Sequence, residues 1–417
     1  MSSNDRLHAL DAVRAFALLG GIALHAATPY VAGVPWVTTE PPSDTLAVFW
    51  YTIHMFRMPL FFLIAGFFGR MMLERRGTGA FVRDRSKRIL LPLVFGLPAV
   101  MAMTGLAWFL GALSSGMDLQ AMQPPEAPPV LSAEPPSLIS RINLIHLWFL
   151  YYMVIFYAAT LLARTVLGLM PARAARLLTA VDTVVGFLMR GVWGPLLLAL
   201  PIALYYSGLK YWSVWGGLPA PFSVVPDVGA LLSYGLFFSF GWLLHRQQQW
   251  LMSLEHRWHG YGALAAILWV ACLAISGPSP HWGPYLKDVE VMVYAVSYVA
   301  AAWCWTFAII GMALRFLSKF SPVSRYLADS SYWLYLMHIA ALILFDQVLH
   351  PFAWHWSIKY PLSIAASMTV LLLSYHFLVR FTLIGATLNG RRYPRTLSNA
   401  PQGTRSELLV AGTKIAN

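Results

Sequence analysis

Residues 9–30 read ALDAVRAFALLGGIALHAATPY, an apolar run long enough to cross a bilayer as one helix. Arg14 and His25 interrupt this run and lie eleven residues apart. Eleven residues make about three helical turns, so both side chains point to nearly the same side of the helix, ~16 Å apart along its axis. Ionisable groups inside a membrane helix are costly and often mark a functional site. We therefore expect a polar track through the membrane along this face.

The composition of the 417 residues is that of a helical membrane protein. The chain is 58% hydrophobic and 11% charged, whereas an average soluble domain is about 25% charged. Apolar runs near twenty residues long recur along the sequence, and the alternating ten-residue pattern of a membrane β-barrel does not. We expect an all-α, polytopic integral membrane protein.

The apolar runs predict about ten transmembrane helices within one membrane domain, residues 1–390, followed by a flexible cytoplasmic tail, residues 391–417. The proline-rich connection 113–140 is expected to be extended, because proline disrupts helix interiors. The expected helices span residues 9–30, 46–69, 89–112, 142–167, 191–208, 227–246, 259–277, 289–314, 330–349 and 361–384.

Basic residues fall in alternate connections between these helices. The connection 70–88 carries seven Lys and Arg residues, whereas residues 31–45 carry none. The positive-inside rule then places the basic connections and both termini in the cytoplasm. The same rule accounts for the net charge of +12, so we expect no nucleic-acid partner.

The first two expected helices carry five ionisable residues within their apolar runs: Asp11, Arg14, His25, His54 and Arg57. Asp11 and Arg14 are three residues apart and can pair on one helix face. His54 and Arg57 lie ~12 and ~16 Å into the apolar layer, counting from residue 46. An arginine at that depth needs a carboxylate, carbonyl groups or a water-filled cavity. Alternatively, Arg14 snorkels to the lipid headgroups and His54 and Arg57 form a buried structural pair.

Two later helices add further candidate residues. His146 lies near the outer interface, where its neighbour Trp148 also fits an aromatic belt. Tyr335 and His338 are three residues apart, with His338 near the middle of the bilayer, and a simple hydrogen bond between them is the alternative to a functional role. The spans contain no H-x-x-x-H with a carboxylate, so no metal site is expected.

The basic connection offers a site for a phosphorylated ligand, because guanidinium groups bind phosphate well. A coenzyme A headgroup docked there could extend its pantetheine arm along the polar track, for which the ~16 Å between Arg14 and His25 is a suitable length. His25 would then act as general base on an acceptor hydroxyl. Ordinary positive-inside charge, or contact with anionic lipid, is the alternative. The candidate phosphate-binding residues are Arg70, Arg75, Arg76, Arg85 and Arg88.

Four segments, in matching order, resemble the acyltransferase-3 family of membrane acyltransferases. They are the Arg14–His25 pair with ten intervening residues, residues 53–67, residues 146–150 and residues 331–338. The resemblance covers about residues 6–385 and is strongest to the branch that succinylates periplasmic glucans.

The resemblance implies ten or so membrane helices and transfer of an acyl group, succinyl or acetyl, from cytoplasmic acyl-CoA to a hydroxyl of an extracytoplasmic glucan or other carbohydrate. The family's catalytic histidine corresponds to His25 and its motif arginine to Arg14. We add Asp11 and His338 as candidate catalytic residues. The candidate substrate-binding residues are His54, Arg57, His146 and Tyr335.

Acyl-CoA is expected as a donor substrate, with no permanently bound cofactor. Membrane lipids and glucan-synthesis proteins are the other expected partners. A secondary transporter that uses the same His and Arg residues as a proton or anion relay is the main alternative function. A scaffold for a glucan-synthesis complex would explain neither Arg57 nor the basic connection.

Overall fold

The computed structural model describes residues 3–115, 142–209, 215, 217–281, 286–390 and 393. Within these ranges the regular elements are helices, and one isolated bridge joins Asn143 to Ser223. The α-helices are α1 (Ser3–Ala27), α2 (Asp44–Arg85), α3 (Leu91–Ser115), α4 (Trp148–Gly168), α5 (Pro171–Leu188), α6 (Gly194–Ser207), α7 (Val228–Arg246), α8 (Gln249–Ser276), α9 (Asp288–Phe316), α10 (Pro322–Leu349), α11 (Trp356–Ser374) and α12 (Leu383–Asn389). The proline-rich connection from residue 116 to 141 and the tail, except Tyr393, lie outside the described residues.

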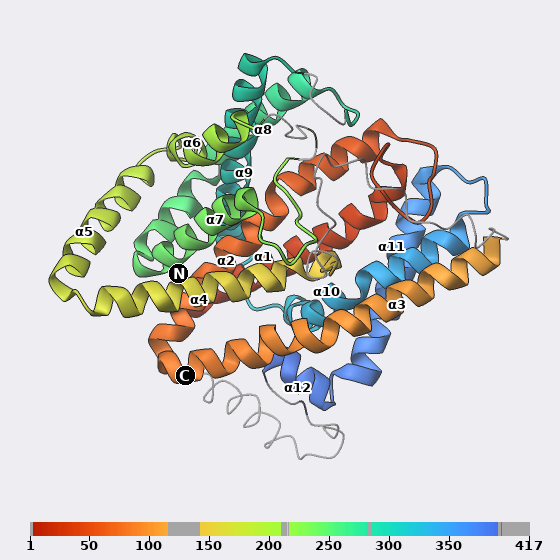
Figure 1. The fold of residues 1–417 in the computed structure, drawn as a ribbon, viewed down its shortest axis with the longest axis horizontal. Coiled ribbons are helices and arrows are strands. Elements are labelled where there is room, and N and C mark those ends of the chain that lie inside the picture. The colour runs from red at the N-terminus through yellow and green to blue at the C-terminus, as the bar shows by residue number, and fades with distance from the viewer. Residues whose placement is uncertain are drawn as a thin grey trace, which may run out of the picture.

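All ten expected helices have counterparts, α1–α4 and α6–α11 (Figure 1). Eight helical stretches of the described chain are long and apolar enough to cross a membrane. One of them, Asp44–Gly111, contains both the second and the third expected helices, and Gly194–Ser207 is a shorter apolar helix. The prediction of an all-α, multi-pass membrane protein is confirmed.

The connection expected at residues 70–88 is helical, and its description as a loop was wrong. Helix α2 continues to Arg85, and a π-helical turn, Ser86–Leu90, leads directly into α3. The chain bends at Gly77, whose φ of 75° and ψ of 171° favour a residue without a Cβ atom. The basic side chains of this region are therefore carried on helical turns, which fix their directions.

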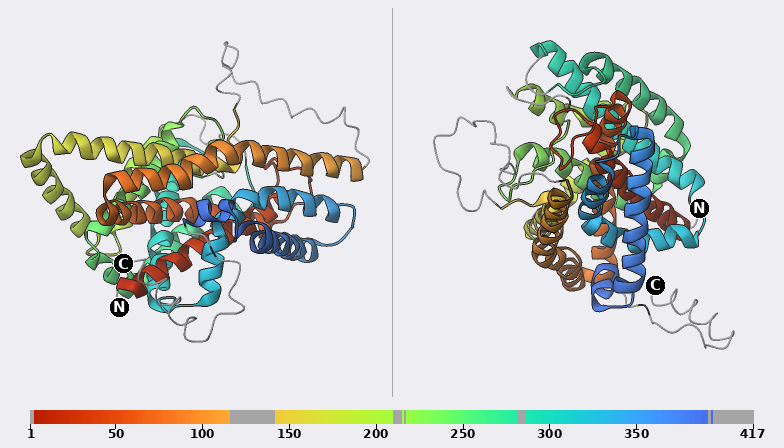
Figure 2. Two further views of the ribbon diagram at one scale, coloured as in Figure 1. Left: turned by 90° about the horizontal axis from the view of Figure 1, so that it is seen from below. Right: turned by 90° about the vertical axis from the view of Figure 1, so that its right-hand side faces the viewer.

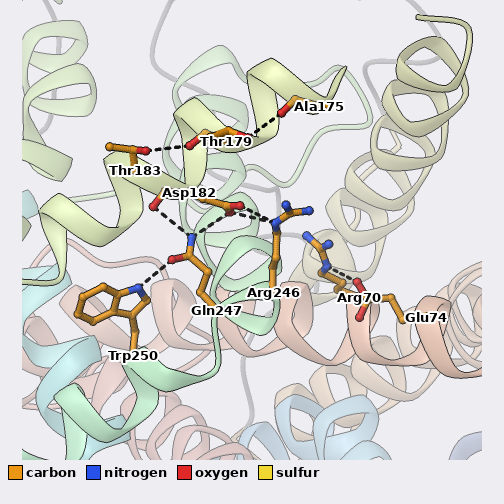
Figure 3. Close-up of polar contacts among 9 residues, drawn as sticks. All are labelled: Arg70, Glu74, Ala175, Thr179, Asp182, Thr183, Arg246, Gln247 and Trp250. Atoms are coloured by element: carbon orange, nitrogen blue, oxygen red, sulfur yellow. Dashed lines mark hydrogen bonds and ion pairs between the residues drawn. The ribbon is translucent and has the colours of Figure 1, made fainter. Parts of the chain in front are cut away.

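Helix α5 was not predicted, because its arginines were read as an ordinary basic connection. It begins with Pro171 in its first turn, a favoured position for proline, and projects from the rest of the bundle in Figures 1 and 2. Its Asp182 accepts hydrogen bonds from Arg246 and Gln247 at the end of α7 (Figure 3). Helices α8 and α10 also begin earlier than expected, at Gln249 and Pro322.

Helix pairs in close contact fix the positions of the polar residues. Helix α8 packs along α9, α6 packs on the same helix, and α1 contacts α2, α9 and α10. Helices α2 and α7 touch backbone to backbone: a Cβ atom on Gly66 would lie 2.0 Å from the carbonyl oxygen of Phe238, and one on Gly241 would lie 1.8 Å from that of Leu63. This close approach holds α2 firmly beside α7.

Candidate functional site

A cavity of about 2340 Å³ is lined by residues from both ends and the middle of the helix bundle. Arginines from α1 and the α2–α3 bend line one end, which we call the arginine end: Arg14, Arg75, Arg76, Arg85 and Arg88. Residues beyond the other end of α1 line what we call the aromatic end: Trp36, Trp108, Asn143 and Phe222. Between them lies the histidine cluster: His25, His54, Arg57, His146 and His338.

Arg14 and His25 both line this cavity, as their spacing predicts. The predicted pairing of Asp11 with Arg14 is confirmed, with 3.3 Å between Oδ1 and Nη1. Arg325 of α10 lies 3.9 Å from the other carboxylate oxygen of Asp11. The carboxylate therefore links α1 to α10 at the arginine end.

Four of the five arginines proposed for phosphate binding lie together at the arginine end, whereas Arg70 does not line the cavity. Arg70 donates to Glu74 at 2.6 Å, in the group of polar contacts near α5 and α7 (Figure 3). Arg88 donates through Nε to the carbonyl oxygen of Leu388 at 3.3 Å. Arg85 lies over the ring of Tyr157, 5.2 Å from its centroid, so aromatic side chains support the cationic surface.

Sequence reasoning missed two further arginines at this end, Arg325 and Arg380, which line the same cavity. Arg380 lies over the rings of Tyr326 and Tyr393, 5.4 and 4.8 Å from their centroids. The available signal was the position of both arginines at the ends of apolar runs, on the same side as the 70–88 connection.

The histidine cluster brings together rings from four separate helical segments. The ring of His338 lies 5.2 Å from that of His25 and 4.9 Å from that of His146, measured between centroids. His338 Nδ1 lies 2.8 Å from the carbonyl oxygen of Tyr335, which can only accept, so Nδ1 carries the proton. In the neutral ring, Nε2 therefore keeps a free electron pair.

Tyr335 and His338 do not form the side-chain hydrogen bond that their spacing suggests. The Tyr335 hydroxyl instead donates to the carbonyl oxygen of His146 at 2.7 Å. Just before His146, Ile145 adopts a φ of 48°, a strained value for a branched residue, and its N–H donates to Asn143 Oδ1 at 2.8 Å. These contacts fix the irregular backbone that brings His146 into the cluster.

Arg57 is a buried cation with few partners. Its Nη1 lies 3.3 Å from His25 Nε2, and its Nε makes no hydrogen bond. Gly21 leaves room for the guanidinium group, since a Cβ atom there would lie 3.1 Å from Nη1. No carboxylate in the described part of the chain forms an ion pair with Arg57. A buried charge without a counter-ion is costly, so this site favours an anionic group in the cavity.

His54 stacks on Trp50, with 4.7 Å between centroids and 14° between planes, and its Nδ1 makes no hydrogen bond. Together, His54 and Arg57 supply polar groups to the cavity that other side chains leave unused. No three His, Cys, Asp or Glu residues are grouped to hold a metal ion within the described ranges.

The non-helical segment 31–43 is fixed at the aromatic end by a buried ion pair that sequence reasoning missed. Glu40 accepts from Lys359 of α11 at 2.8 Å, and its other oxygen lies 2.9 Å from His350 Nδ1. The His350 side chain remains half-exposed at this contact. On the same segment, Trp36 Nε1 donates to Asp346 at 2.9 Å.

Asp346 is a second residue that sequence reasoning missed, although a feature of the sequence could have identified it. It is a carboxylate inside an apolar span, eight residues after His338 on the same helix. It accepts hydrogen bonds from Trp36 and, at 2.6 Å, from Ser363 of α11. Asp346 therefore joins α10 and α11 to the segment that carries Trp36.

Comparisons with known proteins agree with this membrane architecture. Residues 7–376 match the family model described as an acyltransferase domain. Glucans biosynthesis protein C of Escherichia coli SMS-3-5 / SECEC is 34% identical, and that of Escherichia coli O1:K1 / APEC is 33% identical, each over 94 residues. Each match covers 22% of this chain and 24% of the relative.

No solved structure matches the chain. The family model nevertheless spans the chain from α1 through α11, which includes the helices that line the cavity, α1–α4 and α10. The chain therefore belongs to the acyltransferase-3 family of membrane acyltransferases.

Proposed function

We propose that this acyltransferase uses acyl-CoA bound at the arginine end and transfers its acyl group to a hydroxyl of a glucan or other carbohydrate that enters from the aromatic end. The observation that carries this proposal is the shared cavity, which is lined by Arg14 at one end and by His25 in its interior. By the positive-inside rule the arginine end faces the cytoplasm and the acceptor lies outside a bacterial inner membrane.

The arginine end suits the phosphates of coenzyme A. Arg75, Arg76, Arg85 and Arg88 line it together and supply several cationic donors. Arg14, paired with Asp11, stands where the cavity continues towards the histidine cluster. The pantetheine arm then follows α1 from Arg14 towards His25, a rise of ~16 Å along a helix.

The transfer step needs one base and one leaving group. His25 takes the proton of the acceptor hydroxyl, whose oxygen attacks the thioester carbonyl carbon. The carbon–oxygen bond forms, the carbon–sulfur bond breaks, and the coenzyme A thiolate takes a proton from the protonated imidazole. His338, whose ring is 5.2 Å from His25, offers a second imidazole for this proton transfer.

Arg57 is suited to the negative charge that develops on the thioester oxygen. Its Nη1 lies 3.3 Å from Nε2 of His25, a long contact for a hydrogen bond. A bound thioester offers Arg57 a stronger partner and leaves Nε2 free to act as base. A succinyl donor adds a second anionic group for which the unpaired Nε is suited.

His54, His146 and Tyr335 complete the walls around the acyl group. Tyr335 acts through the backbone of His146, to which it donates at 2.7 Å. His54 presents an unpartnered Nδ1. We assign these three residues to substrate binding rather than to proton transfer.

A direct test uses the purified protein in lipid nanodiscs with labelled succinyl-CoA or acetyl-CoA and a gluco-oligosaccharide. We expect coenzyme A release and label on the oligosaccharide. The substitution His25→Ala should reduce transfer by about 10²–10⁴-fold, the usual contribution of a general base. His259→Ala, at an exposed position of α8, is the matched control and should leave transfer unchanged. Normal transfer by His25→Ala would refute the assignment of the base.

A secondary transporter is the second candidate function, because residues at both ends of the bundle line the same cavity. A relay would use the same histidines without breaking a thioester bond. Proteoliposomes that move a proton or an anion, with no release of coenzyme A from either donor, would favour the transporter.

A further inference from the structure

Trp36 lies on the non-helical segment between α1 and α2, and it lines the same cavity as His25. The two rings are nearly parallel, with 16° between planes and 6.3 Å between centroids. Trp36 is half-buried and also packs beside Ile339 and Ile343 of α10. Its indole is therefore supported from one side and available to the cavity.

The orientation of this indole is fixed by hydrogen bonds. Its Nε1 donates to Asp346 Oδ2 at 2.9 Å, while Ser363 donates to Oδ1 of the same carboxylate at 2.6 Å. The segment that carries Trp36 is anchored further along by the buried pair between Glu40 and Lys359. These contacts together hold the indole in one orientation beside the cavity.

We propose that Trp36 is the platform on which the sugar ring of the acceptor stacks, and that Asp346 is the positioning residue that orients it. The C–H face of a pyranose is apolar and packs on the electron-rich face of an aromatic ring. The hydroxyl groups lie at the rim of the sugar, so a ring packed on Trp36 has them within reach of His25, 6.3 Å away. This inference deepens the proposed function and rests on it.

The polar atoms near the aromatic end favour a carbohydrate over a hydrocarbon chain. Thr104 Oγ1 is buried without a hydrogen-bond partner, and Thr104 and Asn143 both line the cavity. A sugar can satisfy such groups with its remaining hydroxyls, whereas an acyl chain would leave them unpaired. The phosphate-binding arginines lie at the opposite end, so the donor and the acceptor need not compete for one entrance.

The test measures the KM values of the donor and the acceptor separately. Trp36→Leu should raise the acceptor KM by about tenfold, in the range that a lost aromatic stacking contact allows, while the donor KM stays unchanged. Trp36→Phe keeps a smaller aromatic face and should raise the acceptor KM less than Trp36→Leu does. Trp354→Phe, at an exposed outer tryptophan that does not line the cavity, is the control and should alter neither KM. An unchanged acceptor KM in both Trp36 variants, or equal rises in both KM values, would overturn the proposal.

Asp346 is tested by rescue. Asp346→Asn retains an oxygen that can accept from Trp36, so its acceptor KM should stay near that of the native protein. Asp346→Ala removes this acceptor and should raise the acceptor KM as Trp36→Leu does. Equal effects of the Asn and Ala variants on the acceptor KM would contradict the positioning role.

Direct binding of the gluco-oligosaccharide, measured by calorimetry without donor, separates this inference from the proposed function. Binding that is weakened by Trp36→Leu supports the platform even if no acyl transfer occurs. Normal transfer by the Trp36 variants would be consistent with the proposed function but would refute the role of Trp36 as the sugar platform. Absence of oligosaccharide binding by the native protein would also refute this role of Trp36.

Discussion

The arginine end and the aromatic end of the cavity are built on different kinds of backbone. The arginine end is carried by helical turns of α2 and the π-helical turn before α3, and its pairs are partly exposed, as in Asp11 and Arg14. At the aromatic end, Trp36 is carried by the non-helical segment 31–43, which is held by the buried pair of Glu40 and Lys359.

This difference matches the two proposed ligands. A phosphate is recognised by charge and tolerates mobile arginine side chains. A sugar ring is recognised by the direction of an aromatic face, which must be fixed before binding. The buried ion pair of Glu40 and Lys359 therefore lies at the aromatic end, where it anchors the non-helical segment 31–43.

The largest effect is expected from breaking this anchor. Lys359→Met leaves the buried carboxylate of Glu40 without its lysine partner, and the loss of one partner of a buried pair typically costs about 3–5 kcal/mol. Arg246→Met breaks the partly exposed pair with Asp182 (Figure 3) and should cost up to ~1 kcal/mol. Thermal unfolding of the two variants in detergent measures the difference. Equal decreases in midpoint temperature would show that the aromatic end has no special anchor.

A slightly smaller effect is expected in the middle of the cavity. Arg57→Gln removes the cation beside His25, and the loss of such a stabilising group should lower kcat by about 10²–10³-fold with both succinyl-CoA and acetyl-CoA. Arg173→Gln, on the exposed start of α5, is the control. A decrease with succinyl-CoA alone would instead assign Arg57 to the distal carboxylate, and an unchanged kcat would exclude it from both roles.

The smallest effect is expected at the arginine end, where several cations contribute to binding of the donor. Replacing Arg75, Arg76 and Arg85 together by Gln should raise the donor KM by about tenfold, because exposed charge contacts are each worth up to ~1 kcal/mol. The acceptor KM should not change. Arg70→Gln is the matched control, since Arg70 pairs with Glu74 outside the cavity. A similar rise in the Arg70 variant would favour general attraction to the basic surface.

Much of the fold could be predicted from the sequence, because helical periodicity is local. Each of the ten apolar runs has a helical counterpart in the described chain, and Arg14 and His25 line one cavity as their spacing predicts. The helical character of residues 70–88 was missed, because arginines in a row suggest a loop as readily as a helix. Helix α5 was missed for the same reason.

The candidate site could be predicted only where its residues lie on one helix. The hydrogen bond from Trp36 to Asp346 joins residues 310 positions apart, and no local sequence pattern predicts such a contact. The same is true of Glu40 and Lys359, which come from a connection and a distant helix. Arg70 does not line the cavity beside Arg75 and Arg76, and it pairs instead with Glu74, four residues along the same helix.

The central claim is that one cavity brings a donor and an acceptor together from opposite sides of a membrane. Sealed proteoliposomes with a gluco-oligosaccharide inside and labelled acyl-CoA outside test it most directly. We expect labelled oligosaccharide inside the vesicles, formed by the molecules whose arginine end faces outward. Label that appears only when both compounds are on the same side of the membrane would contradict the claim.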